Sequence, residues 1–218
     1  MRLGCGGPLE QSVCGSCGHV LLDCAGGHAS CCAPGEATRK HHAVRDVIFE
    51  FSKTADDATE REPQDLVPSR PGLRPADVLS SAAIPGRVAA LDVGVASPFS
   101  PSAGTDAAAH MFARKTGERE AIAGDLAKLN IVYRPVVFTT FGRPHAAASE
   151  TLRYMARRVA RRRGGASRKA ILSQMEGAIS VALARGAARM SLACWPAAAK
   201  APPDLARLAD AFAADVGD

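Results

Sequence analysis

Apolar residues recur with helical spacing soon after the glycine-rich beginning of the chain. Residues 39–53 are expected to form an amphipathic helix, with Thr38 available as its N-cap. The apolar positions on one face of this helix are Val44, Val47, Ile48 and Phe51, whereas His41 and His42 are expected to face phosphate or simply to be exposed. Residues 54–73 are polar and interrupted by prolines, so that only a short strand, at residues 59–62, is expected in them.

Two apolar stretches follow, and they are expected to form adjacent strands that each carry one carboxylate. Asp77 follows Arg74-Pro75-Ala76, and Asp92 lies in a predicted strand over residues 87–97. Alternate residues of that strand face opposite ways, so Asp92 shares its face with the small residues Ala90, Gly94 and Ala96. A carboxylate in an apolar strand is unfavourable without a partner, and a divalent metal is one such partner. The alternative is that both aspartates lie at strand ends, where they are solvated or cap turns.

A lysine occupies the apolar face of the next predicted helix, over residues 107–126. The positions that share this face are Ala107, Ala108, Met111, Lys115, Glu118 and Ile122. Lys115 therefore either reaches the strand carboxylates or pairs with Glu118, one turn further along. The first possibility would place its ammonium group beside Asp77, Asp92 and a bound Mg²⁺.

Residues 131–141 are rich in β-branched and aromatic residues and predict a buried strand. Pro135 indicates an edge or a bulge near its start. From His145 onward the pattern is helical, with breaks at Gly164-Gly165 and at Pro196 and Pro202-Pro203. The predicted order after the N-terminal segment is α-β-β-β-α-β, followed by helices, in an α/β fold.

Cysteines are concentrated at the N-terminus. Of the seven cysteines, all but Cys194 lie in the first 32 residues, where no apolar run is long enough for a signal peptide. A reducing compartment is therefore expected, nuclear or cytoplasmic rather than secreted, and clustered thiols there indicate metal binding. No stretch of the sequence approaches the length of a membrane span.

The spacing within this cluster predicts a structural zinc site. Its ligands are expected to be Cys14, Cys17, His28 and Cys32, a combination that suits tetrahedral zinc. Three substitutions remain open: Cys31 for Cys32, and Cys24 or His19 for His28. Cys5 and Cys194 are expected to be free thiols, and the cysteines could also cluster without a metal.

A basic stretch lies in the predicted C-terminal helices. No acidic residue occurs between Glu150 and Glu176. The arginines that would form a stripe on one helix are Arg153, Arg157, Arg158, Arg161 and Arg162. Such a stripe favours contact with nucleic-acid phosphates over a merely solvated face, because no acid neutralises it. The low aromatic content of 5% and the many alanines predict a thin core and modest stability.

Taken in order, these features resemble a known family. The landmarks are Cys14, Cys17, His28 and Cys32; Lys40-His41-His42; Glu62-Pro63; Arg74-Pro75-Ala76-Asp77; and Leu91-Asp92-Val93-Gly94-Val95. Their order resembles the restriction-enzyme-like endonuclease domain that follows reverse transcriptase in site-specific non-long-terminal-repeat retrotransposons. The resemblance covers residues 14–141, and the chain is similar to a detached C-terminal piece of such an element.

The resemblance implies a PD-(D/E)-x-K nuclease fold, in which Asp77 and Asp92 match the metal-binding acids. The usual lysine two residues after the second acid is replaced by Gly94. In the retrotransposon branch a lysine of the following helix takes its role, and Lys115 is the candidate. The branch often has a second lysine and a tyrosine just afterwards, where this chain has Glu118 and Arg119.

The expected function is therefore DNA endonuclease activity that depends on Mg²⁺ or Mn²⁺. The alternatives are a non-catalytic module that binds DNA or RNA, and a structural remnant without a partner. The expected organisation is a zinc-knuckle segment at residues 1–35, an endonuclease-like core at residues 36–142 and a basic helical tail at residues 143–218.

Overall fold

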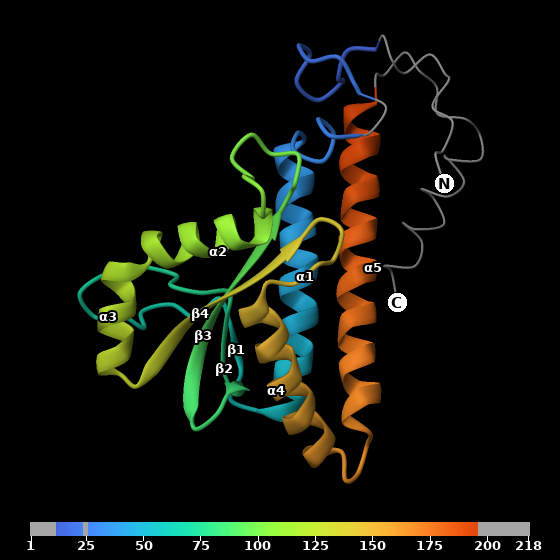
Figure 1. The fold of residues 1–218 in the computed structure, drawn as a ribbon. Helices are drawn as coiled ribbons and strands as arrows, with labels where there is room; N and C mark the ends of the chain where they lie inside the picture. Colours follow the sequence, from blue (N-terminus) through green and yellow to red (C-terminus); the bar gives the residue numbers. More distant parts are fainter. Residues whose placement is uncertain (1–11, 24–25, 196–218) are drawn as a thin grey trace.

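The structure is a computed structural model that describes residues 12–23 and 26–195. This part of the chain is a mixed α/β structure in which helices pack on a four-stranded sheet (Figure 1), which confirms the predicted α/β class. The elements are α1 (Pro34–Ala55), β1 (Glu60–Arg61), β2 (Val78–Ile84), β3 (Arg87–Ala96), α2 (Ala107–Glu118), α3 (Glu120–Lys128), β4 (Ile131–Thr139), α4 (Ala146–Arg162) and α5 (Arg168–Cys194).

The strands lie in the order β1-β2-β3-β4. β1 and β3 both pair with β2 in antiparallel fashion, whereas β4 pairs with β3 in parallel. Pro135 lies on β4, at the edge of the sheet, as its sequence position predicted. An edge strand tolerates proline because the missing N–H leaves no ladder partner unpaired. In the register of β3 with β4, Pro135 lies opposite Asp92.

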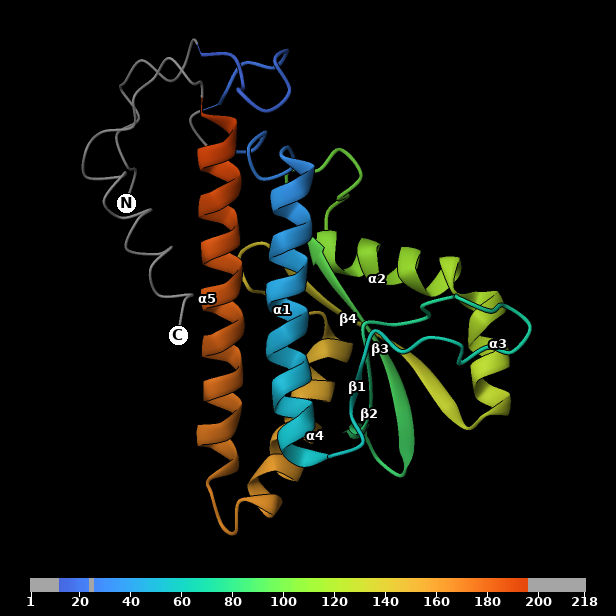
Figure 2. The same cartoon turned by 180° about the vertical axis from the view of Figure 1, so that it is seen from behind.

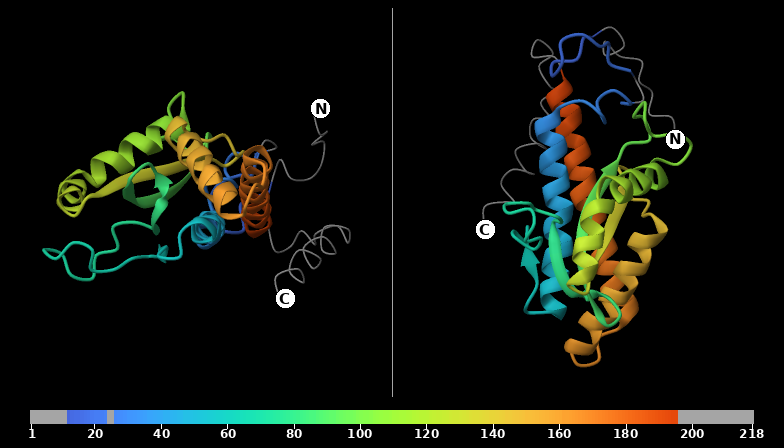
Figure 3. Two further views of the ribbon diagram at one scale, coloured as in Figure 1. Left: turned by 90° about the horizontal axis from the view of Figure 1, so that it is seen from below. Right: turned by 90° about the vertical axis from the view of Figure 1, so that its left-hand side faces the viewer.

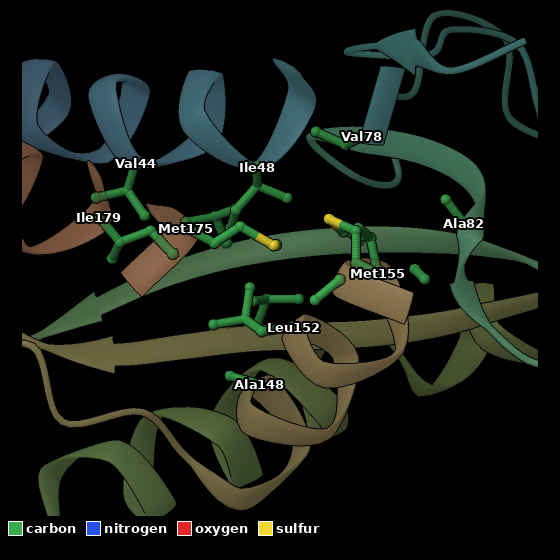
Figure 4. Close-up of a cluster of buried hydrophobic side chains, with 14 of the residues drawn as sticks. Val44, Ile48, Val78, Ala82, Ala148, Leu152, Met155, Met175 and Ile179 are labelled. Carbon is green, nitrogen blue, oxygen red and sulfur yellow. The ribbon is translucent and has the colours of Figure 1, made fainter. Parts of the chain in front are cut away.

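The helices form two layers with the sheet between them. The helices α1, α4 and α5 lie on one side, and α2 and α3 lie on the other (Figure 3). The main core fills the first interface, where Ile48, Leu152 and Met175 of the three helices meet β2 and β3 (Figure 4). Alternation along β3 sends Leu91 and Val93 into this core and leaves Asp92 on the opposite face, with α2.

The long helices α1 and α5 lie side by side and run in opposite directions (Figures 1 and 2). Their close approach depends on Gly186 of α5, because a Cβ atom there would lie 2.4 Å from Cγ of Lys40 on α1. The break between α4 and α5 occurs at Gly164-Gly165, as predicted, where both glycines adopt positive φ angles.

Several element boundaries differ from the sequence-based expectation. Thr38 is not an N-cap, because α1 begins earlier at Pro34, and the Thr38 hydroxyl donates to the Pro34 carbonyl instead. Proline suits the first turn of a helix, since its missing N–H needs no partner there. The expected helix over residues 107–126 is divided at Arg119 into α2 and α3. Asp77 lies immediately before β2 rather than within a strand.

The division at Arg119 has a packing reason. Met111 of α2 packs near Ala96 and Ala103, whereas Ile122 and Leu126 of α3 are buried in a separate cluster. One straight helix would not cover both parts of the twisted sheet. The helix expected beyond Pro196, together with Cys5 and Cys24, lies outside the described residues. Among the residues that are described, no helix combines the length and apolar character needed to cross a membrane.

Candidate functional site

The carboxylate of Asp92 is held by two side chains from neighbouring elements. Lys115 of α2 donates from Nζ to Oδ1 of Asp92 at 2.6 Å, so the lysine reaches the strand carboxylate as the helical spacing suggested. Glu118 is the alternative partner of Lys115, but its Oε1 atom lies 3.7 Å from Nε of Arg114 instead. The Tyr133 hydroxyl of β4 donates to Oδ2 of Asp92. Asp92 is 7% exposed, and these two donors offset the unfavourable burial of its charge.

Glycine at position 94 makes the Lys115 contact possible. A Cβ atom at Gly94 would lie 2.8 Å from Sδ of Met111 and 2.9 Å from Cε of Lys115. Any side chain at this position would therefore push α2 or its lysine away from the strand. Gly94 is thus the residue that allows Lys115 of the helix to approach the strand.

Asp77 lies beside the same part of β3. Its N–H donates to the Leu91 carbonyl at 2.8 Å, and its Oδ2 accepts from the Val93 N–H at 2.7 Å. Its Oδ1 lies 3.1 Å from Nε2 of His41 on α1. Burial raises the pKa of Asp77, but His41, the Val93 N–H and the charge of Lys115 together hold it below its ordinary value. Lys115 therefore acts on both aspartates.

Sequence reasoning missed His41 and Tyr133 as members of this site. His41 was expected to be phosphate-facing or simply exposed, yet it lies three residues before Val44 and seven before Ile48. That spacing places it near the buried face of α1, and it is the signal that could have found it. Tyr133 gave no such signal, because the register that brings its hydroxyl to Asp92 is not readable from the sequence.

The Tyr133 hydroxyl behaves as a proton donor to Asp92. Burial and the negative charge of Asp92 raise the pKa of Tyr133 well above its ordinary value, against a smaller opposite influence of Arg119. The phenol therefore keeps its proton at neutral pH and holds the carboxylate in place. This tyrosine comes from β4, whereas the family that the sequence resembles often has a tyrosine shortly after the helix lysine.

Glu62 and Arg74 belong to one group of ion pairs. Glu62 receives hydrogen bonds from the buried Arg45 of α1 and, at 3.0 Å, from Arg74. Arg45 also pairs with Asp46 at 2.8 Å. This group of ion pairs fixes the polar connection between β1 and β2, and so it positions the backbone that leads to Asp77.

The predicted zinc ligands form one cluster. The ligand atoms of Cys14, Cys17, His28 and Cys32 all lie within 4.8 Å of one another. The Sγ atoms of Cys14 and Cys32 are 3.8 Å apart, and Sγ of Cys17 is 3.4 Å from Nε2 of His28. A tetrahedral site with usual zinc bond lengths has S–S edges of about 3.8 Å and S–N edges of about 3.6 Å. The cluster could therefore bind a zinc ion with little movement.

Protonation in this cluster also suits a metal. Burial raises the pKa of Cys14, but hydrogen bonds from the backbone of Cys17 and Ser16 and from His28 lower it to about 6. Backbone hydrogen bonds from His19 and Val20 lower the pKa of Cys17. Thiolates are the metal-binding form of cysteine, so the fold prepares these ligands before an ion arrives.

The cluster is attached to the end of α5. The Gly15 N–H donates to the Cys194 carbonyl at 2.8 Å, and Cys194 packs with Cys14, Ala29 and Ala33. Burial and the neighbouring Cys14 and Cys32 raise the pKa of Cys194, and this cysteine lies outside the four-ligand group. Cys31 lies outside the four-ligand group, although the sequence allowed it in place of Cys32.

The basic residues of α4 lie in the other helical layer from Lys115. Arg153, Arg157 and Arg161 are exposed, and Arg158 is half-buried. Arg162 pairs with Asp57, an acid from the connection after α1. The structure therefore does not bring this stripe to the carboxylates, because α2 and α4 cover opposite faces of the sheet.

The chain was compared with protein-family models, with curated proteins and with solved structures. No significant match was found in any of these comparisons. Any functional conclusion therefore depends on the residues of the two sites themselves.

Proposed function

We propose that this chain is a metal-dependent DNA endonuclease domain of a retrotransposon-derived protein, with a restriction-endonuclease-like core. One observation carries the proposal: Lys115 of α2 contacts Asp92, and the Asp77 carboxylate accepts a hydrogen bond from the N–H of Val93, the residue after Asp92, so two carboxylates and a lysine lie together. A charged cluster of this kind in a partly enclosed place is more typical of a reactive site than of a structural one.

The order of elements supports the same proposal. The structure follows α1, β1, β2, β3, the α2–α3 pair and β4, which is the α-β-β-β-α-β order that the family resemblance implies. This agreement concerns order alone, since many folds share single steps of it. It supports the nuclease interpretation because the two aspartates and the lysine stand at the matching places in that order.

The centre has room on its oxygens for a divalent cation. Each oxygen of Asp77 and Asp92 accepts one hydrogen bond from the protein, and a carboxylate offers about four acceptor positions. In the described part of the chain, only the cysteine cluster brings three or more metal ligands together. Mg²⁺ needs fewer protein ligands, because it is often held by one or two carboxylates, water and substrate phosphates. Mg²⁺ or Mn²⁺, when bound, would supply an activated water and stabilise phosphate charge.

The side chains around the carboxylates have separable roles in this proposal. Lys115 orients Asp92 and presents positive charge where a scissile phosphate would gain negative charge. Tyr133 fixes the second oxygen of Asp92 and keeps its own proton. His41 holds Asp77, whose lowered pKa keeps this carboxylate ionised at neutral pH. The zinc cluster would serve as a structural support.

The exposed arginines of α4 favour a second function, nucleic-acid binding without cleavage. Arg153, Arg157 and Arg161 offer charge to phosphates of DNA or RNA from the other helical layer. This alternative requires neither Asp77 nor Asp92. It predicts retention of DNA with steep salt dependence and no metal-dependent nicking.

The test is nicking of supercoiled plasmid by the purified full chain. Mg²⁺ is added or omitted in buffer that contains zinc, so that the cysteine cluster stays loaded. Asp77→Asn and Lys115→Met should each lower the rate by at least about 100-fold, because the first removes a metal-binding carboxylate and the second a positive charge beside the reacting phosphate. Asp125→Asn is the matched control: this acid pairs with Lys128 on α3, and its loss should leave nicking unchanged. Nicking that persists in Asp77→Asn would rule out this assignment.

A further inference from the structure

A basic cavity lies next to the carboxylate centre. It has a volume of about 350 Å³ and is enclosed by α1, α2, the end of β3, the loop that follows it and α5. Its charged or ionisable lining residues include Lys40, His41, His110, Arg114 and Lys115, and no aspartate or glutamate lines it. Serine hydroxyls from the loops complete the polar wall. Sites for small ligands have volumes of roughly 300–1,000 Å³, so the cavity is large enough for a phosphate-bearing group.

Lys40 is the unusual member of this lining. It is 4% exposed, which is rare for a lysine without a partner. Within residues 12–23 and 26–195, its ammonium group has no hydrogen bond or ion pair. Glu36, one helical turn earlier, pairs with Arg39 instead. Burial lowers the pKa of Lys40, while the nearby Cys31 opposes that change only in part.

The position of Lys40 is enforced by its neighbours. Its aliphatic stem passes so close to α5 that only glycine fits at position 186, where a Cβ atom would lie 2.4 Å from Cγ of Lys40. The two other long basic side chains of the cavity already have acidic neighbours, because Lys115 contacts Asp92 and Arg114 lies near Glu118. A buried and uncompensated charge is unfavourable for stability, and a bound ligand of opposite charge would compensate it.

We infer that this cavity holds a phosphate group of the bound nucleic-acid strand, with Lys40 as its buried cation. The inference rests on the proposed function for the identity of the ligand, because His41 and Lys115 belong to both the cavity and the carboxylate centre. His41 contacts Asp77 and Lys115 contacts Asp92, and both side chains also line the cavity with Lys40, so a strand bound at the carboxylates would lie against this cavity.

The test measures binding in the absence of Mg²⁺, so that cleavage plays no part. A short fluorescent DNA duplex is titrated with the full chain in zinc-containing, phosphate-free buffer, and anisotropy is recorded at several salt concentrations. Lys40→Met keeps the stem that packs against Gly186 but removes the charge. Its affinity should fall at least about tenfold, and the slope of log affinity against log salt should decrease by about 1. Lys53→Met, an exposed lysine of the same helix, should retain nearly full affinity.

Thermal melting separates binding from a structural role. Without a ligand, Lys40→Met should melt at or above the temperature of the wild type, because a buried unpaired charge is gone. The duplex should raise the melting temperature of the wild type more than that of the variant. A variant that melts well below the wild type, with unchanged DNA affinity, would show that Lys40 is only a packing residue and would overturn the inference.

The remaining outcomes distinguish the two proposals. If Lys40→Met weakens binding although the wild type never nicks plasmid, the cavity inference stands and the endonuclease proposal fails. If nicking depends on Asp77 but Lys40→Met binds DNA like the wild type, the endonuclease stands and the cavity inference fails. Inorganic phosphate is the third probe. If it stabilises the wild type but not the variant, while DNA affinity is equal in both, the site serves a free anion and the inference is wrong.

Discussion

The cysteine cluster and the carboxylate centre are built in opposite ways. The cluster takes Cys14, Cys17, His28 and Cys32 from one short segment, which is attached at the end of α5. The carboxylate centre takes one residue each from α1, α2, β3 and β4, together with Asp77 just before β2. Ligands that are close in sequence need only a local loop, whereas the second centre requires the whole sheet and both helical layers. The first site therefore depends on spacing, and the second on packing.

The largest expected effect is at the cysteine cluster. Cys14→Ser should lower zinc affinity by at least about 100-fold, because a buried thiolate ligand is lost. Metal analysis of purified protein should then find close to no bound zinc in the variant. Cys31→Ser is the matched control, since this neighbouring cysteine lies outside the four-ligand group. Equal loss of zinc from both variants would mean that the cluster uses other ligands.

The next effect concerns the packing that the carboxylate centre requires. Gly94→Ala should destabilise the fold by about 1–3 kcal/mol, because its Cβ overlaps Met111 and Lys115. Plasmid nicking should fall more than tenfold, since Lys115 would leave Asp92. Gly117→Ala on α2 meets no atom within 4 Å and should be neutral or stabilise by up to about 1 kcal/mol. Urea unfolding and nicking rates measure both variants, and a Gly94→Ala variant with unchanged values would contradict the close approach.

A smaller change is expected when one hydrogen bond to Asp92 is removed. Tyr133→Phe should lower stability by about 0.5–1.5 kcal/mol, because Oδ2 of the buried carboxylate loses its donor. Nicking should decrease less than in Lys115→Met, since the lysine remains. Tyr154→Phe on α4 is the control and should leave both the stability and the nicking rate unchanged. A decrease as large as that of Lys115→Met would assign Tyr133 a direct role at the phosphate.

The smallest effect is expected at the start of α2. Asp106 caps this helix by accepting from the N–H groups of Ala108 and Ala109, and it pairs with Arg143. Asp106→Ala should lower the melting temperature slightly, whereas Asp106→Asn should keep the cap. The hydrogen bond from Arg143 lowers the pKa of Asp106, so the folded state prefers its charged form. This contribution is complete above the ordinary carboxyl pKa of about 3.9 and is lost as the pH falls further.

Melting curves between neutral pH and pH 3 test whether the stabilising contribution of Asp106 is lost on acidification. The wild type should lose slightly more stability on acidification than Asp106→Asn, which lacks the titrating carboxyl. If the two proteins change in parallel, the Arg143 pair contributes nothing measurable to folding, as is common for exposed ion pairs.

Much of the fold could be predicted from local patterns. Helical spacing located α1, and alternation along residues 87–97 located β3 and identified its small-residue face. The glycine pair marked the end of α4. These signals are local, because the periods of helices and strands are fixed by backbone geometry. Where a local signal competed with packing, as at Thr38 and at Arg119, the prediction was wrong.

The candidate site was predictable only in part. Asp77, Asp92 and Lys115 could be named because charged residues on apolar faces are conspicuous in a sequence. His41 was assigned to the surface, Tyr133 was not considered, and the burial of Lys40 against Gly186 had no sequence signal at all. Each of these three depends on the register between strands or on the approach of two helices.

The amino-acid sequence by itself indicated the kinds of element, a cysteine and histidine cluster that could bind zinc, and the aspartates that a nuclease would need. Tertiary structure alone decided which side chains meet those aspartates, that Lys40 is enclosed beside them, and that the arginines of α4 face away. The reason is physical. The spacing of residues along one segment fixes the face of that segment on which each side chain lies, whereas contact between segments follows from how their apolar faces pack.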